Sequence, residues 1–402
     1  MTNNKFEFVD KSSKLNNEQL RPSLTYWQDA WRRLRKNKLA MIGLVGVFVI
    51  VLFGIFGPAF TPYSYEDQEL DFKNMPPKLD IHDLGDDLNF YLSREYRLIL
   101  LNDDNEAVRR LDVIKKDNIN KIYTYDFNYN KEVDDEDVII DFSYKLNEEK
   151  RAEAGVDFSI TYKGIEYFEF TDTVRNESYP WGTDHLGRDI LTRVMYGARI
   201  SLTVALVATL VNLLIGVTYG SIAGYEGGNT DNIMMRIVDI INSIPLVLYV
   251  ILLMVLLNDS GLYTIILALG TVYWVNMARL VRGQVLGLKE QEYVLAARTM
   301  GVKKGKIILR HLIPNAMGPI IVSMTMMIPS AVFTESFLSF IGLGVSAPQA
   351  SWGTLANDAL GGLTSFPYQL FFPASAIAIT MLAFNFLGDG LRDALDPRLR
   401  KG

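Results

Sequence analysis

The sequence predicts an all-α polytopic membrane protein with six transmembrane helices and a strand-rich domain inserted outside the membrane. Apolar runs that cross a hydrocarbon layer of about 30 Å need roughly 20 residues each. Six such runs occur, at about 39–60, 199–224, 233–257, 261–281, 314–341 and 370–390. A soluble enzyme does not need six buried helices of this length, so buried core helices are the disfavoured alternative.

Charge is distributed unevenly over the 402 residues, whose formal net charge is −6. Residues 62–180 hold 29 acidic and 15 basic side chains, a net charge of −14, and the remainder carries +8. This pattern predicts an acidic outer domain on a basic inner membrane face rather than a nucleic-acid-binding protein. The chain has no cysteine, which excludes disulfides and thiolate metal sites.

Residues 1–38 are predicted to be a cytoplasmic segment that ends in an interfacial helix, because Trp27 and Trp31 recur at helical spacing in a basic stretch. The first span, 39–60, is longer than the apolar part of a secretory signal. No A-x-A cleavage site follows it, so we expect an uncleaved anchor.

Residues 61–180 are predicted to be an extracytoplasmic domain built from strands. Apolar and aromatic side chains alternate with polar ones in the windows 123–129, 140–146 and 156–162, which is the period of half-buried strands. Lys163-Gly164 then predicts a hairpin turn. Roughly 120 residues suffice for a domain with its own core.

Residues 181–391 are predicted to form a core of five spans, followed by a basic cytoplasmic tail, 392–402. The loop 284–313 within this core is unusual because it is basic and helix-forming. Eight Lys or Arg and only two Glu occur between residues 279 and 311. The positive-inside rule therefore places this loop, and with six spans both termini, in the cytoplasm.

The loop 284–313 has the features of a docking element for a cytoplasmic partner. Ala296 and Ala297 form a small-residue pair that would let another surface approach closely. Gly301 suits the left-handed residue that ends a helix. Pro314 suits the first turn of the next helix.

These residues resemble the cytoplasmic loop of ABC importer permeases of the oligopeptide and dipeptide type. The family spacing is Glu-Ala-Ala, three residues, Gly, and later a segment that ends in Pro. Here Leu295 takes the place of the usual Glu, so that residue's contact with an ATPase is not carried over. Further similar motifs lie at 182–189, 196–199, 339–344, 351–353 and 389–399. The insertion 61–180 is longer than in the members we compare, so the resemblance gives it no function.

The resemblance implies the fold of a type I ABC importer and the function of a permease subunit of an ATP-driven peptide importer in the cell membrane. It implies a second permease subunit, two cytoplasmic ATPase subunits and an outer substrate-binding protein as partners. The ATPases would bind ATP and Mg²⁺, and this chain would hold no cofactor. The residues implied to couple to the ATPases are Glu292, Leu295, Ala296, Ala297, Gly301 and Pro314.

No catalytic motif stands out, so we predict a non-catalytic subunit. The segment 301–306 is one residue too short for a P-loop, and Ile307 replaces its Ser or Thr. No nucleophile elbow is found. The three histidines are far apart in the sequence and have no metal-ligand spacing, so no metal is expected.

Polar residues inside the predicted spans are candidates for pathway lining. Asp239, Asn276 and Glu335 are expected to face protein or a water-filled path, because a carboxylate in lipid is unfavourable by several kcal/mol. For Asp239 we favour structural pairing with Arg236 over pathway lining. For Glu335 the two interpretations stand equal. Pro245 is expected to kink the third span.

Two other function classes remain as alternatives. An ion-coupled secondary transporter would need an inverted repeat and a buried carboxylate relay, and no such repeat is detected. A membrane receptor with an outer sensory domain is disfavoured by the helix-forming loop 284–313. The sequence does not specify the peptide, the role of 61–180 or the identity of the partners.

Overall fold

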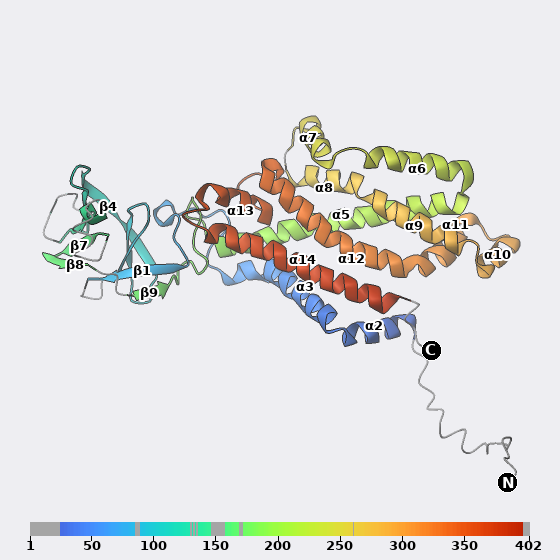
Figure 1. Ribbon diagram of the computed structural model, residues 1–402, viewed down its shortest axis with the longest axis horizontal. Coiled ribbons are helices and arrows are strands. Elements are labelled where there is room, and N and C mark those ends of the chain that lie inside the picture. Colours follow the sequence, from blue (N-terminus) through green and yellow to red (C-terminus); the bar gives the residue numbers. More distant parts are fainter. Residues whose placement is uncertain are drawn as a thin grey trace, which may run out of the picture.

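The computed structural model describes residues 25–84, 89–128, 131, 133, 136–145, 157–168, 172–259 and 261–396. Figure 1 shows an elongated molecule with a β-sheet domain at one end and long helices running away from it. Helix α2 and the end of α14 lie at the far end of the helical bundle, on the same side as α10 and α11. The molecule therefore has two ends of different construction.

The helices belong mainly to the bundle. They are α2 (Tyr26–Lys36), α3 (Lys38–Phe56), α5 (Ile190–Glu226), α6 (Gly228–Asn242), α7 (Leu246–Leu257), α8 (Leu262–Val272), α9 (Trp274–Leu288), α10 (Glu292–Thr299), α11 (Lys304–Ile307), α12 (Ile313–Leu338), α13 (Trp352–Asp358) and α14 (Tyr368–Leu395). In the described residues, five helical segments are long and apolar enough to cross a membrane: 38–60, 190–226, 262–288, 304–343 and 368–395.

The predicted third span, 233–257, is broken into α6 and α7, which are bent by 84°. Pro245 caps the start of α7, with φ −61° and ψ 121°. Proline cannot donate the backbone hydrogen bond that a continuous helix needs, so the break falls at the expected residue. The bend is far larger than a kink, and a sixth crossing is reached only if α6 and α7 together form one span.

The second apolar helix begins earlier than the predicted 199–224. Asp189 precedes its first turn, and its carboxylate accepts the N–H of Thr192 at 2.7 Å. An aspartate in this position caps the free donors of the first turn and complements the positive end of the helix dipole. Helix α5 therefore extends from Ile190 at the sheet end to Glu226 at the far end of the bundle.

Helix α5 packs against α9 through a row of glycines, Gly216, Gly220 and Gly224, which are spaced four residues apart and share one helix face. A Cβ atom built on Gly220 would lie 2.3 Å from the carbonyl oxygen of Ala278, and one on Gly216 would lie 2.6 Å from the Cβ of Met277. Both distances are too short for real contacts. Only glycine permits this separation, as in the small-residue rows of membrane helix pairs.

The strand-rich domain is a nine-stranded antiparallel sheet with the order β8-β7-β6-β5-β4-β3-β2-β1-β9 in the part of the chain that the structure describes. Its strands are β1 (Lys78–Asp83), β2 (Asn89–Leu92), β3 (Leu98–Leu101), β4 (Ala107–Asp117), β5 (Ile122–Asp126), β6 (Val138–Asp141), β7 (Ser159–Tyr162), β8 (Ile165–Tyr167) and β9 (Asp172–Arg175). The edge strands β8 and β9 are close in sequence, so the two edges of the sheet must lie near each other. One apolar core includes Phe90, Tyr125, Ile140 and Ile160.

Strands β5, β6 and β7 confirm the three predicted strand windows in part, and Lys163 and Gly164 form the predicted hairpin turn with φ of 48° and 75°. Tyr144 instead lies in a 3-10 turn at Ser143–Lys145. At the start of this turn the Asp141 carboxylate accepts the backbone N–H of Ser143 at 2.8 Å. Tyr129, the end of the second window and the start of the third lie outside the described residues. Strand β4 was not predicted. Leu111 is its only buried residue, so its sequence does not alternate between apolar and polar side chains as a half-buried strand does.

The chain segments at the two ends of the sheet domain are joined to each other at the sheet end of the bundle. The N–H of Thr183 donates to the Met75 carbonyl at 2.9 Å, and the Thr183 hydroxyl accepts the Met75 N–H at 2.8 Å. Gln369 of α14 donates to Asn74 Oδ1 at 2.9 Å and to the Thr183 carbonyl at 3.1 Å. These buried bonds fix the domain to α14.

Candidate functional site

Helix α10 projects from the end of the bundle that is remote from the sheet (Figure 1). It ends in a Schellman motif: the Val302 N–H donates to the Ala297 carbonyl at 3.1 Å and the Gly301 N–H donates to the Arg298 carbonyl at 3.0 Å. Gly301 has φ +75°. The expected left-handed conformation of Gly301 is confirmed.

The faces of α10 differ in what they contact. Val294 and Ala297 share one face and are buried, with Ala297 only 2% exposed. They pack into a cluster with Tyr225, Val285, Ile307 and Leu312. Ala297 therefore packs against its own chain, and of the two alanines only Ala296 lies on the exposed face.

The other face of α10 is open. Glu292, Leu295 and Ala296 are exposed, and Leu295 is 42% exposed. Met300, at the end of the helix, is 75% exposed. An apolar patch at the tip of a basic segment marks a protein interaction surface more often than a free surface.

Pro314 lies in the first turn of α12, as expected, and is exposed. The helix before it is not interrupted, however. Lys304 to Leu343 forms one continuous helical run, with a π-helical turn at Ile308–Leu312 directly before α12. A π turn accommodates the hydrogen bond that proline cannot make.

Asp239 on α6 pairs mainly with Arg279 on α9, at 2.9 Å, while its distance to Arg236 is 4.0 Å. Structural pairing is therefore present, but its main partner lies on a neighbouring helix rather than on α6. Asn276 is exposed, one helical turn before Arg279. Asp239 and Asn276 are thus on adjacent helices at an accessible part of the bundle.

Glu335 is 0% exposed and does not line a surface of this chain. Its carboxylate accepts hydrogen bonds from Ser201 of α5 and from Ser339, each at 2.8 Å. The Ser201 hydroxyl oxygen also accepts a hydrogen bond from the backbone N–H of Trp352 at 3.4 Å. The structure favours the pairing interpretation for Glu335, because these bonds join α5, α12 and α13.

A buried ion network at the sheet end of the bundle was missed at the sequence level. Asp184 contacts Arg188 at 2.7 Å and Arg193 at 2.5 Å, and Asp358 lies 3.6 Å from Arg193. Burial raises the pKa of Asp184, but the guanidiniums of Arg193 and Arg188 outweigh it and hold the pKa below its ordinary value. The motif 182–189 was recognised, but nothing in its spacing predicted the contact with Asp358.

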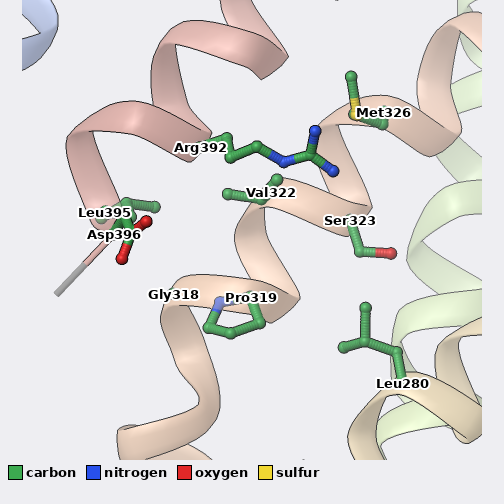
Figure 2. Close-up of a pocket in the computed structure, with 9 residues that line it drawn as sticks. All are labelled: Leu280, Gly318, Pro319, Val322, Ser323, Met326, Arg392, Leu395 and Asp396. Carbon is green, nitrogen blue, oxygen red and sulfur yellow. The ribbon is translucent and has the colours of Figure 1, made fainter. Parts of the chain in front are cut away.

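A cavity of about 370 Å³ lies between α9, α12 and α14 at the end that carries α10. Figure 2 shows Arg392 reaching from α14 toward Met326 of α12, with Val322 beside it. The walls are mostly apolar, and Arg392 supplies the guanidinium. No group of three or more His, Asp or Glu side chains that could hold a metal ion occurs within the described residues.

Comparison with known proteins places the chain in a family. Residues 216–401 match the binding-protein-dependent transport system inner membrane component, and residues 25–77 match the N-terminal TM domain of oligopeptide transport permease C. A solved inward-facing chain of the MetNI methionine ABC transporter is similar with a TM-score of 0.41 and 20% identity, and the match covers 51% of this chain and 96% of that one.

Two relatives from Bacillus subtilis match almost the whole chain. The oligopeptide transport system permease protein is 41% identical over 379 residues, which is 94% of this chain and 92% of the relative. The dipeptide transport system permease protein is 42% identical over 382 residues, 95% of this chain and 88% of the relative. These alignments must run through most of the insertion, so the expectation of an unusually long insertion is wrong for these relatives. The chain is therefore a multi-pass membrane protein that belongs to the family of oligopeptide and dipeptide transport permeases.

Proposed function

We propose that this chain is the permease subunit of an ATP-driven peptide importer and that α10 docks on a separate cytoplasmic ATPase. The observation that carries this proposal is the open apolar face of α10, which includes Leu295 and Ala296 on a helix whose other face is packed against its own bundle. The names of the relatives support peptides as substrates. ATP and Mg²⁺ would bind to the ATPase subunits.

The proposed orientation puts α10 and both termini in the cytoplasm and the sheet domain outside. The basic loop 284–313 supports it by the positive-inside rule. The arrangement in Figure 1 is consistent with it, since α2, the end of α14 and α10 share one end of the bundle and the sheet occupies the other.

The chain would form half of the pathway beside a second, different permease. Exposed apolar side chains on α6 and α7, such as Ile233 and Leu248, would be covered by lipid or by that partner. In the assembled transporter α6 and α7 would act as the sixth crossing. The cavity at Arg392, together with Asp239 and Asn276, is our candidate for the inner part of this half of the pathway.

The sheet domain would contact the outer substrate-binding protein. Its rigid attachment supports this role, because Gln369 and Thr183 bond it directly to α14. A flexible spacer would not need such buried bonds. A domain held in a fixed position can present one surface to a docking partner.

Affinity purification in mild detergent tests the docking proposal. A second permease and two ATPase subunits are expected to copurify with this chain. Ala296→Arg should release the ATPases and retain the second permease, because a bulky cation on the open face prevents close approach, whereas the control Ala296→Ser should release neither. Full ATPase recovery and normal import with Ala296→Arg would contradict the assignment.

A further inference from the structure

The loop 284–313, called the coupling segment below, contacts a turn that lies far from it in sequence, between α5 and α6. The Lys304 ammonium lies 2.8 Å and 3.0 Å from the two carboxylate oxygens of Glu226. The Arg298 guanidinium lies over the Tyr225 ring, 4.8 Å from its centroid. Lys289 donates to the Gly224 carbonyl at 3.0 Å. Three cations thus gather at the carboxyl end of α5, where unpaired carbonyls and the helix dipole favour positive charge.

The same turn is tied to the helices behind it. Arg282 of α9 makes a bidentate ion pair with Asp231 of α6, at 2.5 Å and 2.7 Å. The glycine row at Gly216, Gly220 and Gly224 holds α5 against α9 without intervening side chains. At this end of the bundle α5, α6, α9 and α10 are therefore connected by direct contacts, and α6 leads on to the 84° bend before α7.

We infer that the turn at residues 225–228 takes up the movement of the coupling segment. Glu226 is a positioning residue that holds α10 and α11 at a fixed distance from this turn. The inference rests on the proposed function. When an ATPase displaces α10, the contacts at Glu226 and Tyr225 transmit the movement to α5 and α6. This route adds to the covalent connections that join α10 to α9 and α12. Residues 225–228 read Tyr-Glu-Gly-Gly, which by itself predicts only a tight turn, because Lys304 lies 78 residues from Glu226 in the sequence.

The first test measures peptides imported per ATP hydrolysed. It uses the whole transporter, purified through a tag on this chain, with its binding protein in proteoliposomes and a radiolabelled casein digest as substrate. Lys304 is 67% and Glu226 35% exposed at the side chain, and exposed pairs of this kind are weak, so Glu226→Gln should lower the ratio about two- to five-fold. Lys304→Gln should do the same, and the double variant should be no worse than either single variant.

Two further variants separate positioning from general damage. The swap of Glu226→Lys with Lys304→Glu should restore most of the ratio. The control Asp393→Asn, which neutralises an exposed carboxylate near the end of α14, should leave it unchanged. The inference is overturned if Glu226→Gln matches the unmodified transporter, if Asp393→Asn lowers the ratio equally, or if the swap gives no recovery.

The second test measures a distance and does not depend on the substrate. The chain has no cysteine, so spin labels can be placed on Asn229→Cys and Lys306→Cys, with unlabelled partner subunits. The inference predicts a distance that changes by no more than about 2 Å between the nucleotide-free and the ATP–vanadate states, and a broader distribution in Glu226→Gln. A shift of about 5 Å or more would overturn it. If the unmodified transporter imports no labelled peptide, the proposed function fails and this distance alone decides the inference.

Discussion

Replacing Gly220 with alanine tests the helix pair that supports the coupling segment. The new Cβ would lie 2.3 Å from the Ala278 carbonyl oxygen and 3.0 Å from its Cα. An ordinary contact between carbon and oxygen is at least about 3.3 Å, so α5 and α9 must separate by roughly 1 Å. The obstacle is backbone and cannot rotate away. Overpacking costs about 1–3 kcal/mol, and the better helix propensity of alanine offsets up to about 1 kcal/mol of this.

The expected net loss of about 1–2 kcal/mol in the free energy of unfolding corresponds to a melting point lower by several degrees, at about 2–4 °C per kcal/mol. The assay is thermal unfolding of the detergent-solubilised chain, followed by the fraction that stays monodisperse. Gly283→Ala in α9 is the matched control, because its Cβ would meet nothing within 4 Å. Its stability should be unchanged or slightly higher. Equal stability of Gly220→Ala and Gly283→Ala would refute the close-packing argument.

Three further predictions address other parts of the molecule. The pKa of Asp184 is held below its ordinary value, so its contribution to folding stability is fully present above the unfolded pKa of about 4 and is lost as pH falls through the lower folded pKa. Asp184→Asn should therefore lower the free energy of unfolding by about 3–5 kcal/mol at pH 7. The difference in melting temperature between this variant and the unmodified chain should shrink in acid. Gly301→Val should reduce import, because valine disfavours the φ of +75° at this position by about 1–3 kcal/mol. Gly301→Asn should retain most of the import, because asparagine tolerates this conformation. Equal import by both variants would exclude a backbone effect. Residues 62–180, expressed alone, should unfold cooperatively and show β-type circular dichroism, whereas an unstructured segment would show that the core around Tyr125 needs the bundle.

The sequence was sufficient where a residue's own backbone chemistry decides the outcome. Gly301 ends α10 in the left-handed conformation, and Pro245 begins a new helix, because each restricts or frees its own dihedral angles. Strand β5 was also predictable, because Tyr123 and Tyr125 alternate with polar residues in the local sequence, although both of its faces are buried in the structure.

The sequence was insufficient where the partner is distant along the chain. Ala297 is buried in a cluster that includes Tyr225 and Val285 of other helices, and nothing in the local sequence distinguishes it from Ala296. Glu335 resembles a pathway carboxylate until the hydroxyls of Ser201 and Ser339 are found against it. Tertiary contacts decide such cases, and spacing along one helix does not reveal them.

Import by the reconstituted transporter tests the central claim most directly. Proteoliposomes that contain this chain, its copurifying subunits and the binding protein are supplied with radiolabelled casein-digest peptides. Uptake should require ATP on the cytoplasmic side of the transporter and should stop with Ala296→Arg. When this chain is reconstituted alone, neither uptake nor ATP hydrolysis is expected. Peptide uptake by the chain alone under an ion gradient without ATP, or robust ATP hydrolysis by the isolated chain, would contradict it.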